Sequence, residues 1–506
     1  MKRRHFLMAG AAAGAALAAP MVLTRRAIAA EPGGPLPIPP LMDVDGSAGN
    51  TLTARAGTRE FFPGVSSPTL GFSQDYLGPT LRFAKGRAAK IAVENGTDAP
   101  ITAHWHGMHL PGNLDGGPQL AFGPGETWTP ELPIDHPAAT LWYHSHVHGE
   151  TATQVYRGLA GMILLDDPEI DVPLPRTYGE DDIPLIVQDR LFQRGVMTYD
   201  LGHMDQMAGF QGSDILVNGT LRPTLTVPAG LIRLRLLNAS NARTYEFGFS
   251  DGRGFQQVAS DGGLLPAPQT LTGLHLSPGE RAEIVADFSD RRAVRLVSVD
   301  IAGGMMGGGG MMGGGSMGGM MGSGGMMDGA SGTGDMLDIL SIEVSQQPAR
   351  VSGPLPARLP ADLPDLGAPV RTRDFTLNLH AGGMMGSMFN NLVGRDSQTM
   401  GINGSSYDKG RIDFHVPLGE TERWRINADM MAHPFHVHGA SFLVSGMGGQ
   451  AVDPQANGLK DVVHVDGLTE ILVRFDKPAT DEAPFMYHCH ILEHEDRGMM
   501  GQFTVG

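Results

Sequence analysis

The chain has 506 residues, which is too long for one hydrophobic core and about the length of three ordinary domains. Its 71 glycines and 36 prolines, with only 18% charged residues, favour many short strands joined by turns and disfavour a helical protein. The formal charge of −17 disfavours a nucleic-acid partner, and the single cysteine excludes an intrachain disulfide.

Residues 1–30 have the pattern of a twin-arginine signal peptide. Lys2-Arg3-Arg4 precedes an Ala-rich apolar stretch, and Ala27-Ile28-Ala29 offers a small-residue cleavage site. This leader predicts export of an already folded protein into the periplasm through the bacterial twin-arginine pathway. The alternative is an uncleaved anchor, which is disfavoured because Phe6–Leu23 is barely long enough to span a membrane and contains Pro20. We therefore expect no stable membrane insertion after cleavage.

A strand–turn–strand pattern occurs three times, beginning near residues 79, 223 and 414. A second pattern also recurs, as Pro124-Gly125-Glu126-Thr127, Pro278-Gly279-Glu280-Arg281 and Leu418-Gly419-Glu420-Thr421. Such a large-scale internal repeat predicts three copies of one all-β Greek-key sandwich. We place the three domains at residues 45–170, 175–345 and 371–506, with a Pro-rich linker at 346–370.

Paired histidines lie in the first and third domains only. The first domain carries His104-Trp105-His106 and His144-Ser145-His146, and the third carries His436-Val437-His438 and His488-Cys489-His490. One such pair is weak evidence for a site, but four of them beside the only cysteine are not explained by chance. Imidazole is a good copper ligand, and thiolate and thioether suit copper in its cuprous state.

The segment Tyr487-His488-Cys489-His490 can serve two metal centres. Successive side chains of a strand point to opposite faces, with i and i+2 roughly 6.6–6.8 Å apart on one face. An extended His-Cys-His therefore sends its two imidazoles one way and the thiolate the other. Cys489, His494 and Met499 supply three members of the thiolate, imidazole and thioether set of a blue copper site.

These four motifs, in this order, resemble those of the three-domain multicopper oxidases, and the resemblance covers nearly the whole chain after the leader. It implies three cupredoxin-like domains and four copper ions: one type 1, one type 2 and two type 3. The type 1 ligands would be His433, Cys489, His494 and an axial Met499. The type 2 ligands would be His104 and His436. The type 3 ligands would be His106, His144, His146, His438, His488 and His490. Domain 2 supplies no ligand and is interpreted as a spacer.

Two carboxylic acids match proton-handling acids of that family. Asp115, in Leu114-Asp115-Gly116, corresponds to the acid near the type 2 copper, and Glu495, beside His494, corresponds to the acid near the type 3 pair. The reduction of O₂ to water consumes protons, so acids near the cluster are expected. The alternative is that both are turn or solvent-exposed acids.

The electron donor is predicted from the methionines. Asp429 and Met431 match a substrate Cu(I) site of the bacterial copper-tolerance oxidases, which Met384, Met385 and Met388 could complete. The Gly/Met-rich stretch at 303–327 is expected to be a loop that recruits Cu(I). The alternatives are a core role for Met431 and a low-complexity insertion without function.

The resulting functional prediction is a monomeric cuprous oxidase for copper tolerance. It would oxidise Cu(I), and small phenolic donors, and reduce O₂ to water. A laccase acting on phenols or aryl amines is the first alternative. A non-enzymatic copper-binding or division-associated protein that keeps only the fold ranks last, because every expected copper ligand is present in the sequence.

Overall fold

The computed structural model describes residues 33–47, 49–300, 336–361, 363–380 and 400–506. The predicted leader at 1–30, the Gly/Met-rich stretch at 303–327 and Met384, Met385 and Met388 lie outside these residues. The segment Pro32–Gly506 forms one compact unit. Most of its elements are strands, which confirms the predicted all-β class.

The first group of strands forms two sheets. Its members are β1 Leu41–Asp43, β2 Thr51–Phe62, β3 Val65–Phe72, β4 Thr80–Ala84, β5 Ala88–Lys90, β6 Ala92–Gly96, β7 His104–His106, β8 Thr127–Trp128, β9 Glu131–Pro133, β10 Ala139–His144 and β11 Ala160–Asp166. One sheet has the order β1-β4-β11-β10-β7 and the other the order β3-β2-β6-β8, and β5 pairs with β9. The strand β7, with its two histidines, therefore lies at the edge of its sheet.

The second group is β12 Asp182–Gln193, β13 Val196–Thr198, β14 Asp214–Val217, β15 Thr220–Leu221, β16 Thr224–Ala229, β17 Leu231–Asn238, β18 Tyr245–Phe249, β19 Phe255–Ser260, β20 Gly263–Leu271, β21 Leu274–Leu276, β22 Arg281–Asp287, β23 Val294–Asp300 and β24 Met336–Pro348. Its sheets run β15-β14-β12-β17-β22-β19-β20, with β13 beside β12, and β16-β24-β23-β18-β21. The central strand β17 is buried along most of its length, because β12 and β22 flank it on either side.

The third group is β25 Arg371–Asn378, β26 Gly401–Ile402, β27 Phe414–Val416, β28 Thr421–Ala428, β29 His433–Val437, β30 Phe442–Met447, β31 Gln450–Ala451, β32 Val462–Val465, β33 Thr469–Arg474, β34 Phe485–Cys489 and β35 Met500–Val505. Its sheets run β26-β25-β28-β33-β30-β31 and β27-β35-β34-β29-β32. In β33, buried and half-buried residues alternate, as expected for a strand with one face on a core.

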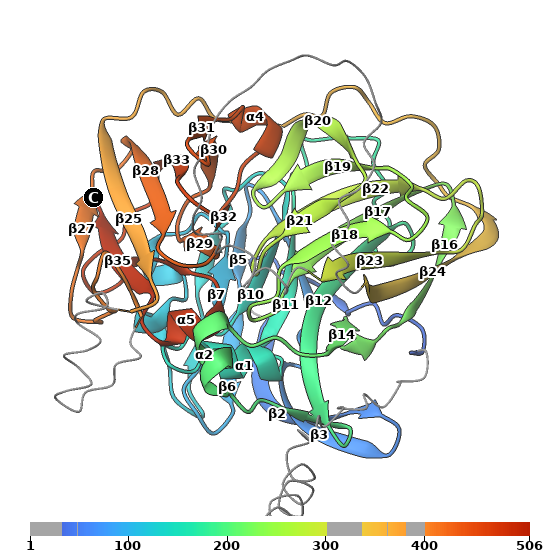
Figure 1. The fold of residues 1–506 in the computed structure, drawn as a ribbon, viewed down its shortest axis with the longest axis horizontal. Coiled ribbons are helices and arrows are strands. Elements are labelled where there is room, and N and C mark those ends of the chain that lie inside the picture. The colour runs from blue at the N-terminus through green and yellow to red at the C-terminus, as the bar shows by residue number, and fades with distance from the viewer. Residues whose placement is uncertain (1–32, 48, 301–335, 362, 381–399) are drawn as a thin grey trace, which may run out of the picture. The chain divides into compact units, whose positions relative to one another are not determined.

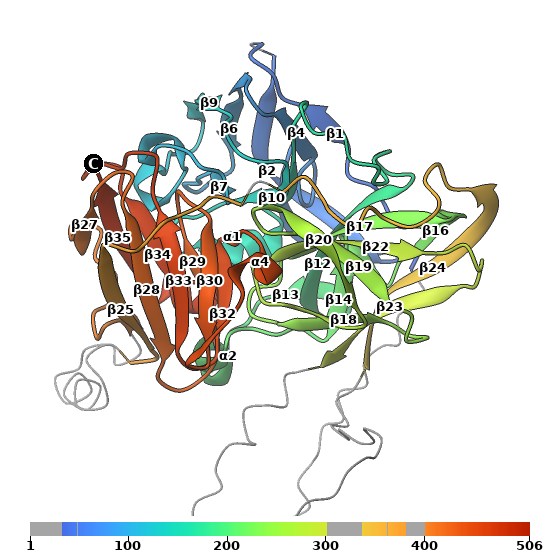
Figure 2. The same ribbon diagram turned by 90° about the horizontal axis from the view of Figure 1, so that it is seen from above.

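Each group of strands encloses its own hydrophobic core. The three sandwiches, here called domains 1, 2 and 3, lie side by side, with domain 1 in blue, domain 2 in green to yellow and domain 3 in orange to red (Figures 1 and 2). This arrangement matches the predicted cupredoxin-like fold. The exact domain boundaries at 45–170, 175–345 and 371–506 stay a prediction.

Short helices fill the connections. They are η1 Gly112–Leu114, η2 Pro118–Leu120, α1 Thr151–Arg157, α2 His203–Ala208, α4 Pro454–Asn457 and α5 Leu492–Asp496. In the described part of the chain, no helix has the length and apolar character needed to cross a membrane. The helix α5 of domain 3 contacts both α1 of domain 1 and α2 of domain 2, so all three domains meet beside the C-terminal motif.

Candidate metal centres

Strand pairing brings the histidine motifs of each domain together. In domain 1, antiparallel pairing of β7 and β10 places His104 opposite His144. In domain 3, pairing of β29 and β34 places His436 opposite His488. The two pairs of strands face each other across the interface of domains 1 and 3, and all eight histidines of the four motifs are buried.

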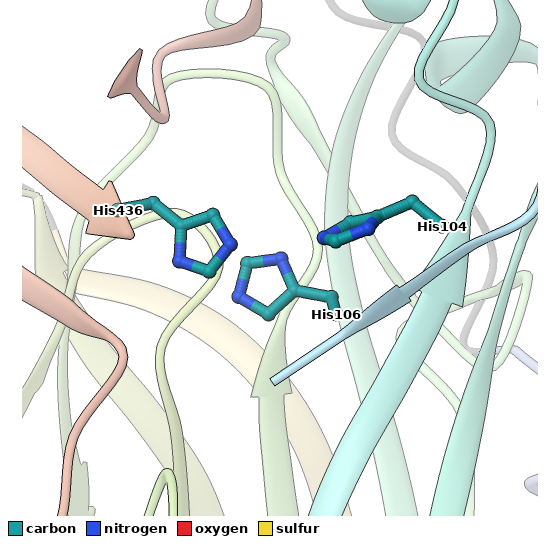
Figure 3. Close-up of side chains that lie close together, drawn as sticks. All are labelled: His104, His106 and His436. Atoms are coloured by element: carbon teal, nitrogen blue, oxygen red, sulfur yellow. The ribbon is translucent and has the colours of Figure 1, made fainter. Parts of the chain in front are cut away.

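The eight histidines form three groups whose ligand atoms lie within 4.8 Å of one another. The groups are His104, His106 and His436; His106, His144 and His490; and His146, His438 and His488. Figure 3 shows the first group, in which His106 lies between His104 and His436 and the three rings converge from two domains. The first group joins the two predicted type 2 ligands with His106, a predicted type 3 ligand, and the division into one type 2 and two type 3 positions stays a prediction.

Backbone carbonyls orient the two predicted type 2 ligands. His104 Nδ1 lies 2.9 Å from the carbonyl oxygen of Asp115, and His436 Nδ1 lies 2.7 Å from that of Asp461. A nitrogen that donates its proton to a carbonyl leaves the other ring nitrogen as the lone-pair ligand. The Nε2 atoms of His104 and His436 are both buried without a hydrogen-bond partner, as a metal site requires.

Imidazole nitrogens also meet at the predicted type 3 positions. His488 Nε2 lies 3.1 Å from His438 Nε2 and 3.3 Å from His146 Nε2. In the other group, His106 Nδ1, His144 Nε2 and both ring nitrogens of His490 are buried without a partner. Buried polar atoms are normally paired, so this concentration of unpaired nitrogens points to cations held between them.

The protonation state of these histidines suits metal binding. Burial, reinforced by neighbouring imidazoles, lowers the pKa well below its ordinary value in six of them: His106, His144, His146, His436, His488 and His490. Burial likewise lowers the pKa of His438 to about 4. These rings are therefore neutral at neutral pH, and neutral imidazole is the form that binds copper.

The second centre is built around the only cysteine. Cys489 Sγ lies 3.3 Å from His433 Nδ1 and 3.7 Å from His494 Nδ1, and the two nitrogens are 3.2 Å apart. His494 Nε2 is 3.1 Å from the carbonyl oxygen of Met207, which leaves Nδ1 as the lone-pair ligand. Met499 is fully buried, and its carbonyl accepts a hydrogen bond from the N–H of Cys489. The donor set fits a blue copper site.

The two predicted acids both reach the histidine cluster. Asp115 Oδ2 accepts a hydrogen bond from His438 Nδ1 at 2.7 Å and lies 3.4 Å from His104 Nδ1. Burial acts to raise the pKa of Asp115, but the two imidazoles outweigh it and hold the pKa well below its usual range. Asp115 is therefore a charged acceptor that keeps Nε2 of His438 free.

Glu495 has the opposite electrostatic character. Its Oε1 lies 3.2 Å from His146 Nδ1 and its Oε2 lies 3.2 Å from His488 Nδ1. Burial, together with the neighbouring Asp496, raises the pKa of Glu495 well above its ordinary value. This shift favours the protonated carboxyl group beside two predicted copper ligands.

Asp461 is a buried acid at the cluster that no sequence motif indicated. Its Oδ1 lies 3.0 Å from His106 Nε2, and its carbonyl oxygen orients His436 as described above. Asp461 follows His436 by 25 residues without a recognisable pattern, so only the fold reveals it.

Asp429 and Met431, the predicted Cu(I) substrate ligands, lie in the connection between β28 and β29. Asp429 is exposed and accepts a hydrogen bond from Asn378 Nδ2 at 3.1 Å. Met431 is half-buried and packs against the domain 3 core, which is the alternative considered for it. Their role as a substrate site stays a prediction.

Family models and curated relatives identify what the chain is similar to. Two models described as multicopper oxidase match residues 53–170 and 375–506. The chain is 38% identical over 507 residues to a protein named cell division protein FtsP from Rahnella sp. (strain Y9602), covering 99% of that protein. It is 35% identical to the protein of the same name from Escherichia coli (strain K12), again over 99% of that protein.

Solved structures give the same fold. A bacterial laccase-like multi-copper oxidase CueO from Ochrobactrum sp. is 38% identical, with a TM-score of 0.81 and coverage of 93% of this chain and 100% of that chain. A laccase from Pediococcus acidilactici is 31% identical, with a TM-score of 0.77 and coverage of 94% of both chains.

The predicted physiological function is wrong. The methionines predict copper tolerance through Cu(I) oxidation, with a laccase acting on phenols as the alternative, whereas curated relatives that match over 93–100% of the chain are named for cell division. The family itself is not in doubt: the chain belongs to the multicopper oxidases.

Proposed function

We propose that this protein serves bacterial cell division from outside the cytoplasmic membrane and does so as a copper-loaded protein. The supporting observation is the identity of 35–38% to proteins named cell division protein FtsP, which extends along nearly the whole chain. The leader at 1–30 supports export, and the twin-arginine pattern supports export after folding and metal loading.

Two sets of residues would hold the copper. His433, Cys489, His494 and Met499 would hold one ion in domain 3, and the eight paired histidines would hold three ions between domains 1 and 3. Copper there would supply one-electron redox chemistry and the reduction of O₂. The buried, unpaired ring nitrogens of these histidines support this assignment.

The division role is tested by deleting the gene in the bacterium that encodes it and measuring cell length and septum frequency. We expect longer cells, restored to normal by the wild-type gene. Normal division in the deletion strain, at ordinary growth and under envelope stress, would reject the proposal. Complementation with Cys489→Ser then asks whether copper is needed: full rescue would separate the division role from the metal.

A second proposal is oxidase activity with O₂ as the acceptor, supported by the buried Glu495, whose carboxyl oxygens lie 3.2 Å from His146 Nδ1 and 3.2 Å from His488 Nδ1 and whose pKa is raised by burial. The chain's own contribution is to hold a proton at the Glu495 carboxyl group. Replacing it by Glu495→Gln should slow O₂ uptake from a chemical reductant about 100-fold or more, because general acids contribute on that order. Unchanged uptake in a variant with full copper content would reject this role.

A further inference from the structure

The turn that reads Pro-Gly-Glu-Thr in domain 1, Pro-Gly-Glu-Arg in domain 2 and Leu-Gly-Glu-Thr in domain 3 has a different environment in domain 2. Residues 124–127 and 418–420, in domains 1 and 3, are exposed or nearly so. Residues 278–281 of domain 2, here called the domain 2 turn, are buried. The first three residues of the turn therefore face solvent in domains 1 and 3 and protein in domain 2. At the fourth position, domain 2 has Arg281 where domains 1 and 3 have Thr127 and Thr421, and of these two threonines Thr421 is buried as well.

Gly279 of the domain 2 turn lies against a predicted copper ligand. A Cβ atom built on Gly279 would lie 3.0–3.1 Å from the Cδ2, Cε1 and Cγ atoms of the His490 ring. The backbone φ of Gly279 is +84°, close to +80° at Gly125 and +79° at Gly419, where the same added atom meets nothing within 4 Å. The glycine allows the positive φ of the turn in all three domains, but only in domain 2 does its missing side chain also let the backbone approach a side chain of another domain.

Arg281 of the same turn reaches the cluster through Asp461. Both side chains are fully buried, and Arg281 binds Asp461 in a bidentate pair with both N···O distances at 2.6 Å. Asp461 in turn lies 3.0 Å from His106 Nε2 and holds His436 through its backbone carbonyl. A planar guanidinium fixes a carboxylate in position and orientation, which an ammonium cannot do as well.

Further hydrogen bonds of Arg281 reach domains 1 and 2, so that, together with Asp461 of domain 3, Arg281 contacts all three domains. Arg281 Nε donates to the carbonyl of Thr140 in domain 1 at 3.1 Å, and Nη2 donates to the carbonyl of Asp261 in domain 2 at 2.9 Å. Lys460 of domain 3 bridges Asp261 and Glu280 at 3.0 Å and 2.9 Å. The pair also fills the space beside Gly107, where an added Cβ would lie 2.6 Å from Asp461 Oδ2.

We propose that the domain 2 turn is a positioning element of the histidine cluster: Gly279 sets the place of the His490 ring, and Arg281, through Asp461, orients His106 and His436. Domain 2 is then part of the metal site without supplying a ligand, rather than a spacer. This inference rests on the proposed copper binding by these histidines.

The direct test compares Gly279→Ala with Gly419→Ala, which carries the same backbone strain but meets open space. Metal-free proteins are loaded with copper against a competing chelator, and copper content, visible absorption and near-ultraviolet absorption are measured. Gly279→Ala should bind copper at the histidine cluster about 10- to 100-fold more weakly, as is typical when residues that orient ligands are lost. The blue absorption of the Cys489 centre should stay at the wild-type level, and Gly419→Ala should load normally.

A second pair of variants tests the same proposal in case Gly279→Ala fails to fold. Arg281→Lys keeps the charge but loses the bidentate fork, and its control is Arg235→Lys, another buried domain 2 arginine whose partners are Asp182 and Glu283. Arg281→Lys should weaken copper binding at the cluster and alter its paramagnetic resonance spectrum, whereas Arg235→Lys should lower only the melting temperature.

The outcomes separate the two proposals. If the wild-type protein takes up no copper, the proposed copper binding fails and the positioning role fails with it. If the wild-type protein loads fully and both test variants load as tightly as their controls, only the positioning role is overturned.

Discussion

At the scale of single residues, the Cys489 thiol decides the character of the domain 3 centre. Burial raises its pKa, although the N–H of Ile491 donates to Sγ at 3.3 Å and opposes the shift. The thiol of the metal-free protein is therefore protonated at neutral pH. Copper binds thiolate, so loading the centre must release this proton, and acid must weaken the binding of the metal.

Replacing the thiol by a hydroxyl should remove the blue centre altogether. We expect Cys489→Ser to lose the intense visible absorption and one copper ion per chain, measured by absorption and by elemental analysis. The matched control is Met499→Leu, a substitution of similar volume that keeps the thiolate. It should stay blue and show a higher reduction potential, because the axial ligand tunes the potential. A blue Cys489→Ser protein would contradict the assignment of this centre.

At the scale of elements, α5 is fixed to domain 2 by one buried side chain. Glu493 accepts hydrogen bonds from the hydroxyl of Tyr199 at 2.6 Å, from Asn241 Nδ2 at 2.8 Å and from the N–H of Phe210 at 3.1 Å. The neighbouring helix α2 adds the Met207 carbonyl that orients His494. Domain 2 thus holds the segment that carries a predicted copper ligand.

Truncating this side chain should destabilise the protein without touching a ligand directly. Glu493→Ala takes the acceptor from the Tyr199 hydroxyl and the Phe210 N–H, whereas Asn241 Nδ2 keeps the carbonyl of Ala152, and each donor left unpaired costs about 1–3 kcal/mol. We expect a clearly lower melting temperature in a thermal scan and a shifted blue absorption band as α5 loosens. The control is Glu420→Ala at an exposed site, where the change should stay within about 0.5 kcal/mol. Equal melting temperatures for both variants would refute this view of α5.

At the scale of the whole molecule, a cluster of ion pairs inside domain 2 is hydrogen-bonded to domain 1. Glu283 of domain 2 accepts from Arg233 and Arg235 of the same domain and from Thr140 Oγ1 of domain 1 at 2.6 Å. Burial acts to raise the pKa of Glu283, but the two arginines outweigh it and lower the pKa to about 2 from the ordinary value of 4.5. Because the folded-state pKa lies below the unfolded-state value, this carboxylate stabilises the fold above pH 4.5 and loses that contribution as the pH falls through about 2.

A neutral replacement should expose this pH dependence. Glu283→Gln should be less stable than the wild type by about 3 kcal/mol at pH 7, because a buried ion network loses one partner. The difference in melting temperature between the two proteins should be constant above about pH 5 and shrink toward pH 2. A difference that stays the same over this range would mean that the charge of Glu283 does not stabilise the fold.

Local chemistry made much of the site predictable. The strand β34 ends with His488 and Cys489, and His490 follows directly, so the alternation expected of an extended His-Cys-His predicts their division between two centres. Asp461 lies in no motif, and Arg281 lies in the repeated turn, which did not by itself indicate a role at the cluster. The importance of both comes from a pair formed across 180 residues of chain. The replacement of threonine by arginine in the repeated turn was the one available signal. The cuprous-oxidase prediction was wrong because soft ligands near a site do not define a protein's role in the cell.

The sequence by itself determined the all-β class, the three-fold repeat and the ligand types, since these depend on residue identity and on spacings of a few positions. Only the tertiary structure decided which histidines share a group, which ring nitrogen is left without a partner, and how the domain 2 turn reaches the cluster. Those features depend on contacts such as Asp115 with His438 and Arg281 with Asp461, formed across domain interfaces. Local sequence patterns do not predict such contacts, because the atoms are brought together by the packing of whole sheets and not by the order of neighbouring residues.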